Sequence, residues 1–234
     1  MADGYSRSPK LLKGALVELA EPFLGPIPNI IIFQYNPESI SRGYKTWAPP
    51  APADNEAPGA GPKDQAKRDR NAPFDPEETF DLALELDATD ALEEPDSHPV
   101  AVIAGIADRL AALEMLVYPM ADANSVLAGA LGGPVPKRGK SKIVLFVWGP
   151  GRIVPVRVQK LSIDEQQFSP LLYPLRAKVS VGLVVLPPSA FADDSGIAKD
   201  LAIGAYKFTR AQKELLAVAN LANSVESILG MLPF

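Results

Sequence analysis

The stretch LRAKVSVGLVV, residues 175–185, alternates apolar side chains with Arg176, Lys178 and Ser180 before it ends on two valines. Successive side chains of a β-strand point to opposite faces, so a period of two predicts a strand with one buried and one wet face. Residues 78–87 repeat this pattern. The apolar positions there are Phe80, Leu82, Leu84 and Leu86. The chain is therefore expected to be built around a β-sheet.

Further strands are predicted on both sides of these two. Residues 12–20 and 40–47 have strand composition, and residues 29–35 contain three consecutive isoleucines, which predicts a strand buried on both faces. Residues 143–148 and 153–163 flank a Gly-Pro-Gly turn, a pattern typical of a β-hairpin. Six or seven strands are expected, mostly antiparallel.

One helix is predicted between the strands. Apolar residues recur at helical spacing over residues 100–118, which indicates one amphipathic helix of about five turns, with Ser97 and Pro99 suited to its start. A parallel sheet would need more helices. The expected fold class is mainly β with α (α+β), an antiparallel β-barrel or sandwich with one flanking helix.

Two segments are predicted to be long loops. Residues 48–73 contain no Val, Ile, Leu, Met or aromatic residue, so they lack the apolar surface that offsets the entropy of ordering. Residues 119–141 include Gly-Gly-Pro and several basic residues. We expect a β domain over residues 1–187 that contains both loops, and a helical extension over residues 188–234.

The extension has a heptad pattern of apolar residues between residues 199 and 229. Leu201, Phe208, Leu215, Ala222 and Leu229 are spaced by seven, and Ala211, Val218 and Val225 follow three positions later. Such a stripe needs a partner surface. We predict that this helix is an assembly element rather than part of the core, that residues 1–187 fold without it, and that its interface includes Phe208, Leu215, Val218 and Val225.

Composition excludes several classes of function. The formal charge is −5, which argues against binding to nucleic acid. The chain has no cysteine and one histidine, His98, so thiol nucleophiles, cysteine zinc sites and Ser-His-Asp triads are excluded or very hard to build. Residues 1–10 lack the apolar core of a signal peptide, and no stretch approaches the length that spans a bilayer. We expect synthesis in the cytoplasm and no membrane insertion.

The charged clusters do not form a catalytic pattern. Acidic residues gather at 75–78 and 93–96, and basic residues at 137–142. We interpret the acidic clusters as solvated turns, the basic run as a solvated loop or an electrostatic contact to a partner, and His98 as a surface residue near a helix start. We predict no catalytic residue, no metal site and no cofactor. The alternative from another class is a carboxylate-dependent hydrolase or binding protein that uses the acidic residues and a metal.

Three segments together resemble a known family. They are Phe33-Gln34-Tyr35-Asn36-Pro37-Glu38-Ser39-Ile40, then Leu161-Ser162-Ile163-Asp164-Glu165, and Phe168-Ser169-Pro170-Leu171-Leu172-Tyr173-Pro174-Leu175-Arg176-Ala177. The pattern over residues 10–187 is similar to that of the tube and baseplate adapter proteins of bacterial contractile injection systems, which are phage-tail-like particles. Many relatives continue into a LysM-type module, where this chain has the helix 199–229.

The resemblance implies a structural role and no enzymatic activity. It implies a tube-protein fold in a six-fold ring of copies, with the inner tube protein, the spike hub and the baseplate wedge as partners. It also implies assembly in the bacterial cytoplasm into a particle that translocates protein. The alternative within this class is the major inner-tube protein. Besides the helix residues above, candidate interface residues are Lys137, Arg138, Arg176 and Lys178.

Overall fold

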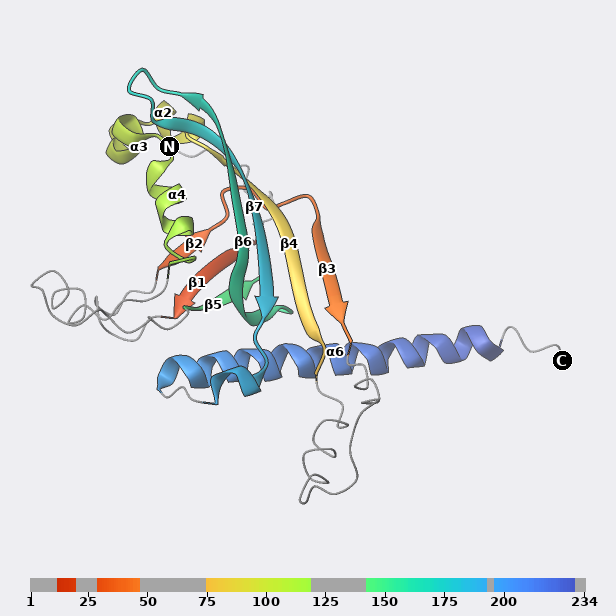
Figure 1. Cartoon of the computed structure of the whole chain (residues 1–234). Helices are drawn as coiled ribbons and strands as arrows, with labels where there is room; N and C mark the ends of the chain where they lie inside the picture. The colour runs from red at the N-terminus through yellow and green to blue at the C-terminus, as the bar shows by residue number, and fades with distance from the viewer. Residues whose placement is uncertain (1–11, 20–28, 47–74, 119–141, 193–195, 230–234) are drawn as a thin grey trace, which may run out of the picture.

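Seven strands form one antiparallel sheet in the computed structural model (Figure 1), which describes residues 12–19, 29–46, 75–118, 142–192 and 196–229, with side chains as far as residue 221. The strands are β1 (Ala15–Leu19), β2 (Ile30–Ile32), β3 (Ile40–Lys45), β4 (Glu77–Asp87), β5 (Ile143–Val147), β6 (Ile153–Phe168) and β7 (Pro174–Val185). Their order across the sheet is β2-β1-β5-β6-β7-β4-β3. The expected β-rich α+β class is confirmed.

The sheet is one curled layer rather than two facing sheets. β4 and β5 are separated by β6 and β7 in the strand order, yet the rings of Phe80 on β4 and Phe146 on β5 lie 5.3 Å apart between centroids. Phe146 also stacks on Trp148, which in turn meets Phe33. The curl therefore encloses an aromatic core, while β2 and β3 are the two edges of the described sheet.

The alternation seen in the sequence determines which face points into the curl. β4 and β7 pair along most of their length, from Thr79 opposite Val184 to Asp87 opposite Arg176. On both strands the apolar set is buried. Its members are Phe80, Leu82, Leu84 and Leu86 on β4, and Ala177, Val179, Val181, Leu183 and Val185 on β7. The hairpin of β5 and β6 is confirmed, and β6 continues to Phe168, beyond the expected end at residue 163.

The expectation of a doubly buried strand at residues 29–35 is wrong. β2 is an edge strand that pairs only with β1 in the described sheet, and the side chains of Ile30 and Ile32 are exposed. Continuous β-branched residues fit a central strand and an edge strand equally well. The tertiary neighbours, rather than the composition, decide how much of such a strand is covered.

The expected five-turn helix over residues 100–118 is broken into two. α3 (Pro99–Ala104) and α4 (Ala107–Glu114) meet at Gly105, whose φ is +59°. A Cβ at this position would lie 2.1 Å from the carbonyl oxygen of Pro174, so only glycine fits. The same oxygen accepts a hydrogen bond from the amide of Ile106. α4 packs Leu110 and Leu113 into the core, whereas Ile103 on α3 is exposed.

The remaining helices follow β4 and β7. α2 (Thr89–Glu93) leads from the end of β4 toward α3, which begins at the expected Pro99. After β7, the 3-10 turn η1 (Pro188–Phe191) buries Phe191 and leads to α6 (Ile197–Leu229), which confirms the predicted long helix. α6 runs across the ends of the strands, and the β6–β7 hairpin lies at the opposite end of the sheet (Figure 1). The predicted loops 48–73 and 119–141 lie outside the described residues.

Candidate assembly surface

A buried ion pair fastens α6 to the sheet. Glu78 lies on the face of β4 that also carries Phe80, and its side chain is 8% exposed. Lys213 of α6 donates to its Oε2 over 2.7 Å, and the hydroxyl of Tyr44 on β3 donates to its Oε1 over 2.9 Å. Three elements therefore meet at one carboxylate, which needs these donors because it is shielded from water.

A second polar contact lies one to two helical turns earlier. The hydroxyl of Tyr206 donates to Asp75 over 2.9 Å, and Arg210 pairs with the other oxygen of the same carboxylate. The hydrogen bond from Arg210 lowers the pKa of Asp75, whereas burial and the bond to Asp75 raise the pKa of Tyr206 to about 12. Asp75 thus stays ionised and Tyr206 stays neutral over the physiological pH range.

The inner face of α6 completes the attachment. Ala202 and Thr209 are buried, and Tyr206 packs against the core cluster. The Thr209 hydroxyl donates to the carbonyl of Ile153 over 2.7 Å and accepts from its amide over 3.0 Å, so it continues the hydrogen bonding of β6 at the point where that strand begins. These contacts combine a small apolar area with directional polar bonds, which fix the orientation of the helix.

The interpretation of the acidic cluster at residues 75–78 as a solvated turn is wrong for Asp75 and Glu78, whereas Glu77 is exposed. Asp75 and Glu78 are acceptors for cations of α6. The sequence did contain a signal, since Glu78 is in phase with Phe80 and Leu82 in the alternation of β4. Glu93, Glu94 and Asp96 are exposed, as expected. No group of three or more acidic or histidine side chains in the described part of the chain is placed to hold a metal ion.

Sequence reasoning also missed a buried acid on β1. Glu18 is 6% exposed and accepts from Lys142 over 2.9 Å and from the Asn29 side chain over 3.3 Å. Lys142 belongs to the basic run that we interpret as a solvated loop or an electrostatic contact to a partner, but this member of the run pairs within the chain. Lys137 and Arg138 lie outside the described residues. His98 is exposed at the start of α3, as expected.

The opposite face of α6 carries the predicted apolar stripe and is exposed. We call the face with Leu201, Phe208, Leu215 and Val218 the outer face of α6. These side chains are 48% to 70% exposed. Leu201 and Phe208 directly precede the buried Ala202 and Thr209, so at 3.6 residues per turn they project about 100° away from them. The other predicted members at residues 222, 225 and 229 lie beyond the described side chains. The stripe is therefore not used to build the core of this chain.

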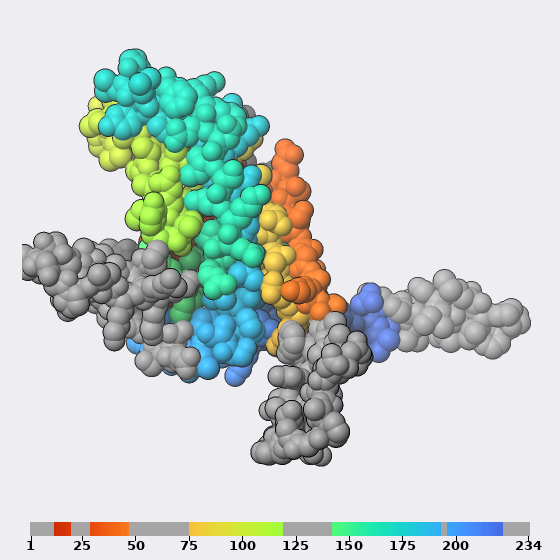
Figure 2. Space-filling model, viewed as in Figure 1, coloured from red at the N-terminus to blue at the C-terminus, as the bar shows by residue number. Residues whose placement is uncertain are grey.

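A second apolar surface lies at the tip of the β6–β7 hairpin, which Figure 2 shows as a knob beyond the rest of the sheet. The hairpin tip, residues 168–173, exposes Phe168, Leu171, Leu172 and Tyr173. Leu172 is 79% exposed and has a φ of +64°, a conformation that bulky side chains rarely adopt. The amide of Tyr173 and the carbonyl of the same residue both bond to Ser169, which holds the turn in shape.

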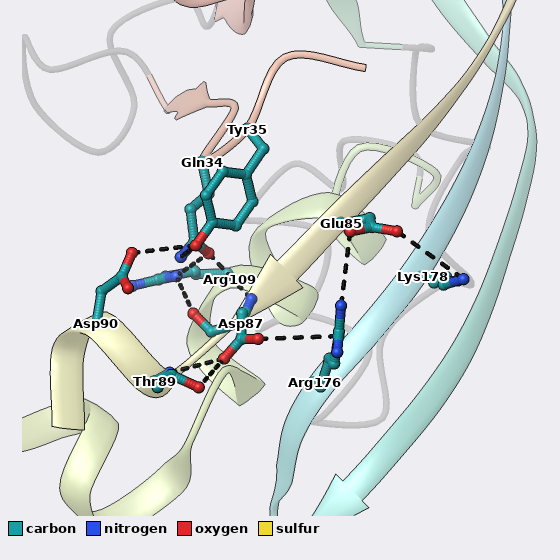
Figure 3. Close-up of polar contacts among 9 residues, drawn as sticks. All are labelled: Gln34, Tyr35, Glu85, Asp87, Thr89, Asp90, Arg109, Arg176 and Lys178. Carbon is teal, nitrogen blue, oxygen red and sulfur yellow. Dashed lines mark hydrogen bonds and ion pairs between the residues drawn. The ribbon is translucent and has the colours of Figure 1, made fainter. Parts of the chain in front are cut away.

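Residues of the segment 33–40 form a hydrogen-bonded cluster between β2, the end of β4 and α4 (Figure 3). The Gln34 side-chain oxygen accepts from Arg109 over 2.7 Å and from the amide of Asp87 over 3.0 Å. Beside it, the Tyr35 hydroxyl donates to Asp90 over 3.1 Å, and this bond raises the pKa of Tyr35. The motif residues at this site therefore join distant parts of the chain.

Asn36 extends this hydrogen-bonded cluster to the first residues that the structure describes. Its side-chain oxygen accepts from the amide of Gly14 over 2.8 Å, and its nitrogen donates to the carbonyl of Leu12 over 2.8 Å. Its neighbour Phe33 is buried in the core. The segment thus positions β1 and β2 relative to each other, a structural task for residues that carried part of the family resemblance.

The two cations predicted on β7 lie on the outer face of the sheet. Arg176 is near Glu85 at 3.7 Å and Asp87 at 3.8 Å, and Lys178 is 3.9 Å from Glu85 (Figure 3). The pKa of Asp87 is lowered chiefly by hydrogen bonds from Thr89. These pairs are partly exposed, so each contributes little to stability. They give this face a mixed, solvated charge pattern.

Comparison with known proteins does not place this chain in a family. No family model matches it, and no curated protein matches it. Among the helices of the described residues, none has the length and apolar character needed to cross a membrane.

Proposed function

We propose that this protein is a structural ring component of a bacterial contractile injection system, an adapter between the inner tube and the spike hub. The proposal begins from the resemblance of residues 33–40, 161–165 and 168–177 to the tube and baseplate adapter family. Copies of the chain would form the ring, and the tube protein, the hub and the baseplate wedge would be its neighbours. No catalytic step is assigned to any residue.

One structural observation carries the proposal. Exposed apolar surfaces lie at two opposite ends of the sheet, the hairpin tip at one end and the outer face of α6 at the other (Figure 1). A contiguous exposed apolar patch usually marks an interaction site. A ring component needs surfaces for the proteins around it, its own copies included, and the described part of this chain carries exposed apolar side chains at both ends of the sheet.

The major inner-tube protein is the alternative within the same class. A tube subunit also needs surfaces at both ends, because each ring stacks on the next. The two roles differ in stoichiometry, since an adapter forms one ring per particle and a tube protein forms many. Counting copies against a sheath or hub protein in purified particles distinguishes them.

A carboxylate-dependent hydrolase is the alternative from another class. It would need the acidic residues at 75–78 to be available for a metal or a substrate. Asp75 and Glu78 instead accept bonds from Arg210, Tyr206 and Lys213. A ligand that binds the folded state must raise its stability, so a melting temperature that rises with calcium or magnesium would favour this alternative.

Replacement of the two surfaces tests the proposed function. Leu171→Ser with Leu172→Ser, and separately Leu215→Asp with Val218→Asp, should leave the monomer folded because all four side chains are exposed. Each double variant should fail to join particles that the unchanged protein joins, as seen by electron microscopy and quantitative mass spectrometry. Ser189→Ala serves as the control variant. Normal incorporation of both variants would contradict the proposal.

A further inference from the structure

α6 consists of two segments with different surroundings. The proximal segment, residues 197–213, packs on the sheet through Thr209, the Asp75 contact and the Lys213 pair. The distal segment, residues 214–229, extends past the edge strand β3 (Figure 1). At 1.5 Å per residue it reaches roughly 24 Å beyond the last anchor.

The distal segment is apolar on several sides. Leu215, Leu216, Val218 and Leu221 are each at least 63% exposed. The segment has only two charged residues, Glu214 and Glu226. Large apolar side chains exposed along a helix usually mark a surface that a partner covers, and β3 is the edge of the described sheet on this side.

Gly204 gives an independent indication of a second helix. It lies in the interior of α6 on the outer face, between Leu201 and Phe208, and a Cβ built there meets no described atom within 4 Å. Glycine destabilises a helix interior relative to alanine. Nothing in the described fold requires glycine here, whereas a close approach by another helix would require a residue without a side chain.

The two segments also differ in the sign of their charge. Residues 197–213 contain four basic residues, Lys199, Lys207, Arg210 and Lys213, and one acidic residue, Asp200, whereas residues 214–229 contain two acidic residues and no basic one. Asp75 and Glu78 offset two of these cations, and the proximal segment remains the more positive one. Opposite charge favours contact between a proximal and a distal segment and disfavours contact between two of the same kind.

We propose that the distal segment of α6 packs on the proximal segment of a second copy, over its Leu201, Gly204 and Phe208. This arrangement rests on the proposed function, in which copies form a ring. It is a head-to-tail contact, and such contacts close into a ring when the rotation between copies allows it. It covers both exposed apolar surfaces of the helix with one interface and explains the glycine.

Cross-linking of the full chain tests the contact, because the natural sequence contains no cysteine. Leu201→Cys and Leu216→Cys are prepared separately and mixed with a short bismaleimide. A cross-linked dimer is expected in the mixture and not in either variant alone. The double variant should give a ladder of higher species. Lys160→Cys, exposed on the outer face of the sheet, is the control and should give no dimer with either variant.

Gly204→Leu, introduced into the cross-linking variants, provides the second part of the test. The added side chain should abolish the cross-link without loss of helix content, measured by circular dichroism. Dimers from a single variant, a double variant that stops at a dimer, or cross-linking unchanged by Gly204→Leu would each overturn the head-to-tail contact. Rings that still form with Gly204→Leu in electron microscopy would overturn the contact and leave the proposed function standing. A cross-link without any ring or particle incorporation would support the contact and contradict the proposed function.

Discussion

The ammonium of Lys213 lies 2.7 Å from a carboxylate oxygen of Glu78, although 135 residues separate them in the chain. The pair joins the predicted extension to the predicted β domain at a buried position. The sequence indicated only an acidic turn and a lysine on a helix, whereas the structure joins the two residues in one contact. Together with the contacts of Thr209 and Asp75, it holds α6 against the sheet.

Lys213→Met should lower the free energy of unfolding by about 2 kcal/mol. The change leaves the buried Glu78 with the Tyr44 hydroxyl as donor and with Arg42 3.9 Å away. The expected loss is below that for fully buried pairs because Lys213 is 40% exposed. Urea denaturation measures it. Lys207→Met, on the exposed side of the same helix, should change stability by less than about 0.5 kcal/mol. In the double variant with Glu78→Gln, the losses should not add.

Tyr206 should ionise later than an ordinary tyrosine. Burial and its bond to Asp75 raise its pKa to about 12, so the folded state holds the proton more tightly than the unfolded state. The resulting stabilisation is complete below pH 10 and is lost as the pH rises from about 10 to about 12. The phenolate absorbance of the unchanged protein minus that of Tyr206→Phe should titrate with a midpoint near pH 12. A midpoint near 10 would show that the contact is absent in solution.

Asp75 should make stability depend on pH in the acid range. The hydrogen bond from Arg210 lowers its pKa below 3.8. Stabilisation by Asp75 is therefore present above pH 3.8 and is lost as the pH falls further. Asp75→Asn should be less stable than the unchanged protein at pH 6, and the difference should shrink toward pH 3. Denaturation at several pH values measures this, and a constant difference would contradict it.

Replacement by alanine should lower the stability of the fold at Gly105 and raise it at Gly204. Gly105→Ala places a Cβ 2.1 Å from the carbonyl oxygen of Pro174 at a φ of +59°, which should cost about 3 kcal/mol or more. Gly204→Ala meets no described atom and removes a helix-interior glycine, so the monomer should gain about 1 kcal/mol. Thermal melts at low protein concentration measure both. Equal effects would mean that the α3–α4 break is not required by sterics.

Truncation should show that the two segments of α6 contribute differently to the stability of the fold. A chain that ends at Ala217 keeps Thr209 and Lys213, and its stability should stay within about 1 kcal/mol. A chain that ends at Pro187 loses these contacts and leaves Glu78 without Lys213. The sequence led us to expect a stable domain over residues 1–187, whereas the packing of α6 predicts a loss of several kcal/mol or aggregation. Equal stability of the two truncated chains would support the expectation that residues 1–187 fold without α6.

The sequence by itself determined most of the strands. The alternation of residues 78–87 and 175–185 records which side chains face the core, because the period of a strand is a local property. The hairpin at the Gly-Pro-Gly turn and the extent of α6 were equally local. Glu78 also obeyed the alternation of β4, so its burial was available from the pattern of the strand.

Only the tertiary structure decided how these elements are covered. The partners of Glu78 lie on β3 and α6, the exposure of β2 follows from its place at the sheet edge, and the break at Gly105 is required by the nearby carbonyl of Pro174. None of these neighbours is close in sequence. Burial and pairing depend on contacts between distant segments, which periodicity does not contain, and for that reason the face of α6 that binds the sheet differs from the apolar stripe that its sequence displays.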